Sequence, residues 1–328
     1  MNKVVYITGC LGFIGYHVTK RCLDEGYYVF GIDKKTYASN LNFLPTLTSY
    51  KNFKFLESDI NDIERILDCD YFINTAAETH VDNSIVSSDV FLRSNINGVH
   101  KILELIKVMP KARRPIFLHF STDEVYGDIK EGFHTETDLL KPSNPYSASK
   151  AAAENLVNSY FITYDCDVIT TRCTNNYGPR QSPEKLIPKT ILLAKQNKKI
   201  PIYGTGKNIR DWIFVLDHCD AILKILFKGK SGESYNISTN NEVNNITIVK
   251  NILKIMGKSD DLIEFISDRP GHDFRYSLNS NKIRRELSWK PTYRFDDGLE
   301  KTIDWYQHNK EWQKNVSNKM LTTFWKTR

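Results

Sequence analysis

This sequence has few long apolar stretches, no regularly spaced pairs of cysteines and few runs of like charge. Its six cysteines show no C-x-x-C spacing, which argues against a zinc site or a disulfide framework, so no metal is expected. No window approaches the roughly 18 apolar residues of a membrane span, and the start, MNKVVYITGC, lacks an export signal. A net charge of +6 without a long basic run argues against nucleic acid as a partner. We therefore expect a soluble, cytoplasmic protein.

The spacing of apolar runs indicates the fold class. With 328 residues and 41% hydrophobic content, the chain can bury a large core and is long enough for two domains. In the N-terminal half, short apolar runs alternate with amphipathic stretches, which predicts a parallel sheet with helices on both faces, the Rossmann-type doubly wound α/β class. The predicted strands lie within 3–8, 27–33, 53–58, 70–76, 115–121 and 167–172, and the predicted helices at 15–25, 89–109 and 146–164.

Beyond residue 172 the sequence becomes richer in Pro and Asn. The predicted helices become shorter, at 187–196, 216–228, 246–256 and 298–308. We therefore predict a Rossmann domain over 1–172 and a second, smaller α/β substrate-binding domain over 173–328, with some segments of the second returning to the first.

Three glycines follow the first predicted strand, in TGCLGFIG. Gly9, Gly12 and Gly15 would let the backbone approach a pyrophosphate at the N-terminus of the next helix. Asp33 ends the second strand, where a carboxylate can bind an adenosine ribose and would repel a 2′-phosphate, which favours NAD over NADP. Two lysines follow Asp33 and oppose this preference. Glycines that serve only tight packing are the alternative, but the strand, the helix and the acid together favour a dinucleotide site.

A second pattern, NPYSASKAAAENL, contains Tyr146 and Lys150. Four residues apart at the start of a predicted helix, they share one face, so the ammonium can lower the pKa of the phenol and make Tyr146 a proton acceptor. A bare Tyr-x-x-x-Lys pair is usually a solvated helix face. With a dinucleotide fold and the hydroxyl of Thr122 at the end of the preceding strand, the pair instead matches the needs of a short-chain dehydrogenase/reductase.

Two acids, Asp123 and Glu124, directly follow Thr122 in FSTDEVYGD. Oxidation alone does not need them, so they suggest a second step in which one group abstracts a proton and another donates one. Elimination of water is such a step. The alternative is a solvated acidic loop, which competes poorly because parallel sheets bind ligands at the carboxyl ends of their strands.

Several motifs together resemble the NAD-dependent nucleotide-sugar dehydratases of the extended short-chain dehydrogenase/reductase superfamily, and most closely the dTDP-glucose 4,6-dehydratase family. The motifs are GFIG, TAAETHVDNS, STDEVYG, NPYSASKA, NNYGP, PEKLIP, PIYGTGKNIRDW and RPGHDFRY, in the family's order over all but the C-terminal segment. The Asp-Glu pair is the most discriminating, because related epimerases lack both acids, and related decarboxylases and GDP-mannose dehydratases usually have Ser before the Glu.

The resemblance implies a mechanism. Tyr146, assisted by Thr122 and Lys150, would remove the proton of the glucose 4-hydroxyl while hydride passes from carbon 4 to NAD. Glu124 would then take the proton from carbon 5, and protonated Asp123 would give one to the departing 6-hydroxyl. Return of the hydride to carbon 6 and of a proton to carbon 5 yields the 4-keto-6-deoxy sugar.

The resemblance also implies binding residues. The cofactor-binding positions would be Gly9, Gly12, Phe13, Ile14, Gly15, Asp33, Asp59, Ile60, Ala76, Ala77, Thr79, Tyr146 and Lys150. The positions for the nucleotide and pyrophosphate of the substrate would be Asn175, Lys185, Leu186, Pro201, Tyr203, Arg210, Asn245, Arg269 and His272. Cys10 stands where the family usually has another glycine and is expected to crowd the pyrophosphate turn. Around NKMLTTFW no clear match to a nucleotide-binding aromatic of the family is found.

The expected partners are a nucleoside-diphosphate glucose and a second copy of the chain. The two helices predicted at 89–109 and 146–164 carry more apolar surface than one covering face needs, and the family pairs them as a four-helix bundle in a homodimer. The alternatives are a UDP-glucose 4,6-dehydratase, an NAD-dependent nucleotide-sugar epimerase or decarboxylase, and a non-catalytic NAD-binding protein.

Overall fold

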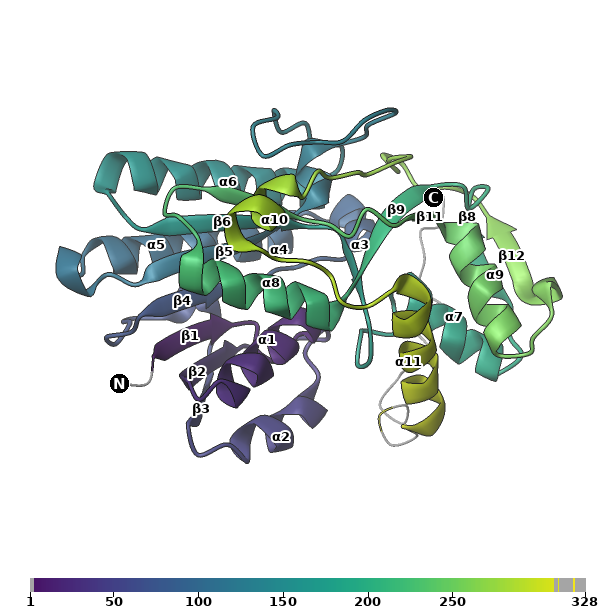
Figure 1. Cartoon of the computed structure of the whole chain (residues 1–328), viewed down its shortest axis with the longest axis horizontal. Coiled ribbons are helices and arrows are strands. Elements are labelled where there is room, and N and C mark those ends of the chain that lie inside the picture. The colour runs from purple at the N-terminus through teal and green to yellow at the C-terminus, as the bar shows by residue number, and fades with distance from the viewer. Residues whose placement is uncertain (1–2, 310–311, 313–320, 322–328) are drawn as a thin grey trace.

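A seven-stranded parallel sheet forms the larger part of the molecule (Figure 1). The computed structural model describes residues 3–309 together with Trp312 and Leu321. The strand order is β10-β6-β5-β4-β1-β2-β3. The strands are β1 (Val4–Thr8), β2 (Tyr28–Asp33), β3 (Phe53–Glu57), β4 (Tyr71–Asn74), β5 (Ile116–Thr122), β6 (Val168–Cys173) and β10 (Ser234–Ile237). The doubly wound α/β class is confirmed, and β10 is a strand from the C-terminal half that the sequence pattern did not predict.

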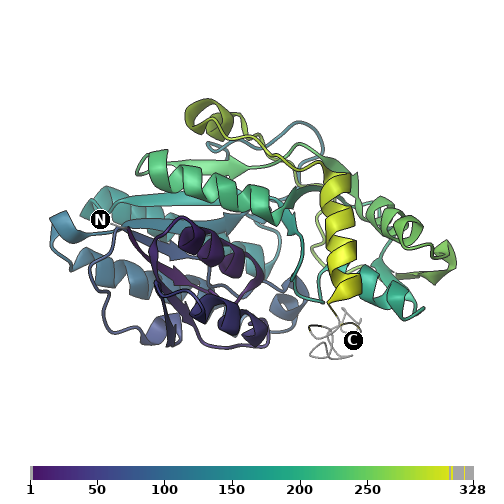
Figure 2. The same ribbon diagram turned by 60° about the horizontal axis from the view of Figure 1, so that its bottom comes forward.

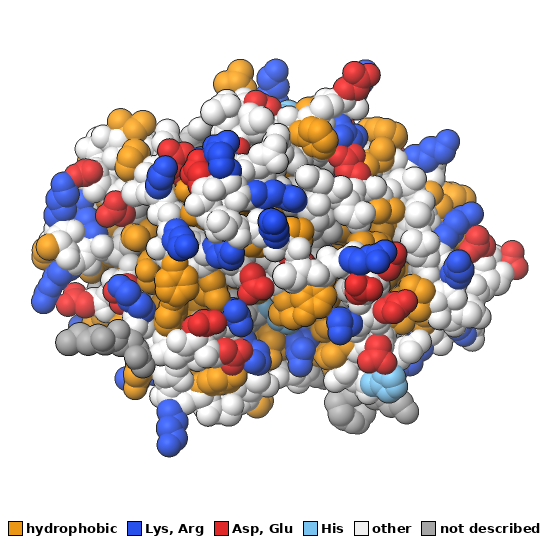
Figure 3. Space-filling model, in the orientation of Figure 1, with side chains coloured by type: hydrophobic (Ala, Val, Ile, Leu, Met, Phe, Trp, Pro, Cys, Tyr) orange, Lys and Arg blue, Asp and Glu red, His pale blue; other side chains and the backbone are white. Residues whose placement is uncertain are grey.

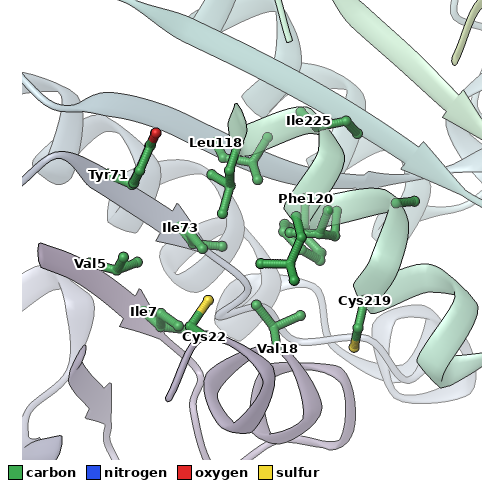
Figure 4. Close-up of a cluster of buried hydrophobic side chains, with 14 of the residues drawn as sticks. Val5, Ile7, Val18, Cys22, Tyr71, Ile73, Leu118, Phe120, Cys219 and Ile225 are labelled. Atoms are coloured by element: carbon green, nitrogen blue, oxygen red, sulfur yellow. The ribbon is translucent and has the colours of Figure 1, made fainter. Parts of the chain in front are cut away.

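Alternating side chains give the sheet two buried faces. Val5 and Ile7 of β1 point into one core with helices α1 (Phe13–Asp24) and α8 (Val215–Lys228), as Figure 4 shows. Tyr6, between them, points into the opposite core with α5 (Gly98–Lys107) and α6 (Pro145–Tyr164). Because successive residues of a strand face opposite sides, apolar residues at every position produce a sheet covered on both faces.

The helix predicted over 89–109 is present without a break over 89–107, but it is not α-helical throughout. It consists of α4 (Asp89–Phe91), a π-helical turn (Leu92–Asn97) and α5. Within the π turn, buried Asn95 exchanges hydrogen bonds with the backbone of Glu78 and donates to Ser149 Oγ of α6 at 2.8 Å. The π turn therefore occurs where the Asn95 side chain forms hydrogen bonds with the loop after β4 and with α6. The shorter helices beside the large sheet are α2 (Leu44–Thr48), α3 (Val81–Val86) and α10 (Asn281–Leu287).

The smaller part lies beyond the carboxyl ends of these strands, to the right in Figure 2. It contains a three-stranded sheet, β11-β9-β7, and a two-stranded sheet, β12-β8, with their own hydrophobic core. The strands are β7 (Asn175–Tyr177), β8 (Ile200–Tyr203), β9 (Ile209–Phe214), β11 (Glu242–Asn244) and β12 (Ile263–Ile266). The helices are α7 (Leu186–Lys195), α9 (Asn245–Ile255) and α11 (Phe295–His308). The predicted helices of this half are present, whereas its short strands were not predicted.

Charged side chains of both signs are interspersed on the face shown in Figure 3. No described helix has the length and apolar character to cross a bilayer. Among the described residues, no three His, Cys, Asp or Glu side chains gather as metal ligands. The six cysteines are free, and five of them are buried, while Cys69 is half-buried.

Candidate active site

The three glycines of the turn between β1 and α1 have different structural roles. A Cβ at Gly9, whose φ is +69°, would lie 2.8 Å from the backbone nitrogen of Ala76, and a Cβ at Gly15 would lie 2.0 Å from the Gly9 carbonyl oxygen. These two glycines are therefore required by packing. Gly12 is the N-cap of α1, and the nearest atom to a Cβ there is the Gly9 oxygen at 3.2 Å. Gly12 is thus the position where an absent side chain leaves backbone open to a ligand.

Cys10 does not crowd this turn. Its side chain is buried in the core, where its sulfur lies 2.8 Å from the position that a Cβ on Gly31 would occupy. Because Gly31 has no side chain, the core has room for the sulfur beneath the sheet. The expected crowding of the pyrophosphate side is therefore wrong.

Asp33 is held rigidly at the end of β2. Its carboxylate accepts hydrogen bonds from the backbone N–H of Leu11 at 3.0 Å and of Lys35 at 2.9 Å, and from Ser39 Oγ at 2.6 Å. Both lysines that follow are paired elsewhere, Lys34 with Asp59 at 3.4 Å and Lys35 with Glu57. The positive charges of the two lysines are thus balanced by Asp59 and Glu57. The carboxylate of Asp33 therefore determines the local charge at the end of β2.

A continuous cleft runs along the carboxyl ends of the parallel strands and contains every cofactor position that the sequence suggested. Its first section is lined by Gly9, Gly12, Asp33, Asp59, Ile60, Ala76 and Ala77. Its central section is lined by Phe13, Ile14, Gly15, Thr79, Tyr146 and Lys150, together with Gly9, Gly12 and Ala77. The glycine turn and the loop after β4 therefore belong to one surface, as expected for strands that end at the same edge of a sheet.

The central section also contains the catalytic candidates. Thr122 ends β5 and caps the 3₁₀ turn that follows it; Thr122 Oγ1 accepts a hydrogen bond from the Glu124 N–H at 3.3 Å and donates one to Asp123 Oδ1 at 3.1 Å. Tyr146 and Lys150 lie in the first turns of α6, which begins at a capping box formed by Asn144 and Ser147. The strand end and the helix start thus bring a hydroxyl, two carboxyls, a phenol and an ammonium together.

Burial changes the proton affinities of these groups. Complete burial, reinforced by the charge of Glu124, raises the pKa of Asp123 to about 7 against the opposing charge of Arg210. Asp123 therefore carries a proton through much of the neutral range, which suits a proton donor. Burial also lowers the pKa of Lys150 to about 8.

Tyr146 differs from the sequence-based expectation. Burial and the charges of Glu124 and Asp123 raise its pKa, while a hydrogen bond with Thr122 acts in the opposite direction. The Lys150 ammonium donates to the carbonyl of Phe120, and its charge is not among the main influences on the pKa of Tyr146. The expected lowering of the phenol pKa by Lys150 is therefore outweighed in this arrangement.

The far section of the cleft unites all nine suggested substrate positions. They come from β7, α7, β8, β9, α9 and the loop after β12: Asn175, Lys185, Leu186, Pro201, Tyr203, Arg210, Asn245, Arg269 and His272. Glu124 and Asn175 line both this section and the central one. A ligand lying in the far section can therefore reach the catalytic candidates.

The basic side chains of the far section already have internal partners. Arg269 pairs with Asp82 at 2.6 Å, and His272 contacts Asp268 at 2.6 Å. Arg210 donates to three backbone carbonyls and lies 4.1 Å from the centre of the Tyr276 ring. These contacts fix the directions of the side chains before any ligand arrives.

Sequence reasoning missed several residues of the cleft. The polar ones include Ser39, His80, Asp82, Thr174, Gln181, Glu184, Lys189, His218 and Tyr276. Asp82 and Glu184 stand inside motifs that carried the resemblance, TAAETHVDNS and PEKLIP, but a single acid within a motif has no distinctive spacing. Their proximity to the other cleft residues depends on the packing of distant segments.

Known proteins share this arrangement. The family model described as GDP-mannose 4,6 dehydratase matches residues 6–302. The dTDP-glucose 4,6-dehydratase of Xanthomonas campestris pv. campestris is 42% identical, with 94% of this chain and 95% of that protein covered. The chain belongs to the dTDP-glucose 4,6-dehydratase family. Members of this family are hydro-lyases within the extended short-chain dehydrogenase/reductase superfamily.

Solved structures of the family have the same fold and contain NAD. The dTDP-glucose 4,6-dehydratase of Streptomyces venezuelae, solved with NAD bound, has a TM-score of 0.91 and 38% identity, with 94% of this chain and 98% of that one covered. The enzyme of Bacillus anthracis, also in complex with NAD, has a TM-score of 0.86 and 41% identity, with 95% and 99% covered. The suggested family is therefore confirmed.

Proposed function

We propose that this protein dehydrates dTDP-glucose to the corresponding 4-keto-6-deoxy sugar with NAD as its cofactor. The observation that carries the proposal is the pair of adjacent acids at the end of β5. Asp123 is buried with a pKa of about 7, and Glu124 lies between the central and far sections of the cleft. One acid with a proton and one placed toward the substrate section are what an elimination requires.

NAD fits the first two sections of the cleft. Gly12 leaves backbone open at the N-terminus of α1, and the fixed carboxylate of Asp33 suits a ribose diol. When bound, NAD would supply a hydride acceptor, and its positive charge would favour loss of the proton from the Tyr146 phenol. Relatives of this chain contain NAD in their structures, which supports the same cofactor here.

The residues divide the proton transfers among them. Tyr146 takes the proton of the 4-hydroxyl, and the Thr122 hydroxyl lines the same section of the cleft. Glu124 removes the proton from carbon 5, which the neighbouring carbonyl has made acidic. Asp123 gives its proton to the 6-hydroxyl, so that this group leaves as water. Lys185, Arg210 and Arg269 present positive charge to the diphosphate.

Glu124→Gln tests this assignment. Since the amide cannot take the carbon 5 proton, the variant should oxidise dTDP-glucose and accumulate reduced cofactor, but release no water and incorporate no solvent deuterium at carbon 5. Tyr146→Phe should block the preceding oxidation, so no reduced cofactor should appear. Product formation by Glu124→Gln at the wild-type rate would refute the mechanism.

Two other activities remain as outcomes of the same assay. An epimerase or decarboxylase would give a product without the mass loss of one water, and Asp123 argues against both because neither needs a second acid. A faster turnover of UDP-glucose than of dTDP-glucose would assign the chain to the UDP-glucose-acting relatives. The C-terminal stretch NKMLTTFW, where a base-contacting aromatic was sought, lies largely outside the described residues.

We further propose a homodimer through α4, α5 and α6. Exposed apolar side chains lie along these elements, among them Val90, Leu92 and Ile162 at 54%, 44% and 72% exposure. Exposed Ala148 and Ala152 on α6 would allow close helix approach. Light scattering at micromolar concentration should give twice the chain mass, and a monomeric mass would contradict the proposal.

A further inference from the structure

Asp82 joins two residues of the substrate section to the cofactor-binding part. It lies in α3, whereas Tyr203 ends β8 and Arg269 lies in the loop after β12. Asp82 Oδ1 accepts a hydrogen bond from Arg269 Nη1 at 2.6 Å, and Oδ2 accepts one from the Tyr203 hydroxyl at 2.6 Å. One carboxylate therefore fixes two proposed substrate contacts that are 66 residues apart in the chain (269 − 203).

The carboxylate is well suited to this task because it is buried and charged. Asp82 is 7% exposed, and the charge of Arg269 together with the Tyr203 hydroxyl holds its pKa below the usual range despite burial. A buried charge is costly unless it is paired and hydrogen-bonded. Asp82 meets both conditions through these two side chains, so it remains an anion at neutral pH.

The guanidinium of Arg269 keeps one edge for another partner. Nη1 is occupied by Asp82, whereas Nε is buried without a partner and Nη2 makes no hydrogen bond within the described residues. Nε–H and one N–H of Nη2 are parallel, and this two-donor edge matches two oxygens of a phosphate. The side chain belongs to the same cleft wall as Lys185 and Arg210.

We propose that Asp82 is a positioning residue for the substrate's diphosphate: by holding Nη1, it keeps the Nε–Nη2 edge of Arg269 available to a phosphate and fixes Tyr203 at the same time. This inference rests on the proposed function, since it takes the ligand to be a nucleoside diphosphate. If the Asp82 carboxylate occupied the phosphate-binding position, it would accept hydrogen bonds from Nε and Nη2 of Arg269. It accepts one from Nη1 instead, so it does not take the place of the phosphate.

The first test compares Asp82→Asn with the wild type, both loaded with NAD. The amide keeps the size of the side chain but loses its charge and one acceptor, so Arg269 and Tyr203 lose their common anchor. We expect the Kd of dTDP, measured by calorimetry, and the KM for dTDP-glucose to rise roughly tenfold, with kcat unchanged, because hydrogen bonds to charged groups have about this effect. Asp167→Asn, which removes a charge from exposed Asp167 outside the cleft and outside the proposed dimer helices, should leave both constants unchanged.

A double-mutant cycle separates positioning from a general structural role. In an Arg269→Met background, Asp82→Asn should weaken dTDP binding by roughly threefold instead of tenfold, because only the hydrogen bond with Tyr203 remains to be lost. Additive losses would show that Asp82 acts independently of Arg269. Tighter binding of dTDP by Asp82→Asn would show that the carboxylate competes with the phosphate. Either result would overturn the inference.

Tyr203→Phe is a second, milder variant that keeps the test decisive if Asp82→Asn does not fold. It removes only the hydroxyl that donates to Asp82, so we expect a loss of dTDP affinity of roughly threefold. Full affinity in Tyr203→Phe would show that this hydrogen bond positions nothing. A wild-type protein that binds no dTDP would overturn the proposed function, whereas dTDP binding that none of these variants changes would overturn only the role of Asp82.

Discussion

The first section of the cleft, which we call the cofactor section, and the far section, which we call the substrate section, are formed by different kinds of groups. The cofactor section consists of backbone turns and small side chains at the ends of adjacent parallel strands, with Asp33 as its main charge. The substrate section consists of charged side chains from distant segments, held by internal partners such as Asp82 and Asp268. The first can be recognised by local spacing in the sequence, whereas the second requires the tertiary structure. Asp123 and Glu124 line the central section between them, and Glu124 also lines the substrate section.

The largest effect on turnover is expected from a substitution of Asp123. Asp123→Asn should lower the rate of product formation by about 10²–10⁴, because an amide cannot protonate the leaving hydroxyl. Oxidation at carbon 4 should continue, so reduced cofactor should accumulate in single turnovers. In the wild type, elimination should fall as pH rises above about 7, where Asp123 loses its proton, and the variant should lack this dependence. An unchanged rate in Asp123→Asn would contradict the assigned role.

The same substitution should stabilise the fold. The pKa of Asp123 is raised to about 7 in the folded state, so its contribution to stability is full at low pH and is lost as pH rises toward 7. An asparagine does not titrate, and Asp123→Asn should therefore exceed the wild type in free energy of unfolding by roughly 2–4 kcal/mol at pH 8. The difference should be smaller at pH 5. Thermal unfolding at both pH values measures it, and a gain that is equal at pH 5 and pH 8 would exclude this cause.

A smaller effect is expected in the cofactor section. Asp33→Ala should reduce the preference for NAD over NADP by roughly tenfold or more, because it removes an acceptor for the ribose and the repulsion of a 2′-phosphate. The lost bonds to Leu11, Lys35 and Ser39 should also weaken NAD binding itself. Binding titrations with both dinucleotides give the ratio. Equal affinities of the wild-type protein for NAD and NADP would overturn the role of Asp33.

Local signals suggested one part of the candidate site. The glycine turn, Asp33 and the Tyr146–Lys150 pair lie within single strand–turn–helix units, where spacing of a few residues determines which side chains share a face. The direction of the Lys150 ammonium was not predictable in this way, because the Phe120 carbonyl that binds it belongs to a neighbouring strand. The π turn around Asn95 escaped prediction for the same reason, since its partners lie in other elements.

The sequence by itself determined the doubly wound fold, the cofactor turn and the family, because alternation of apolar residues and short motifs act over a few residues. Tertiary structure alone decided the proton affinity of Asp123, the pairing of Arg269 with Asp82 and the return of β10 to the large sheet. These features depend on burial and on contacts between residues far apart in the chain. A carboxyl has its ordinary pKa until packing removes water from it and places another charge beside it.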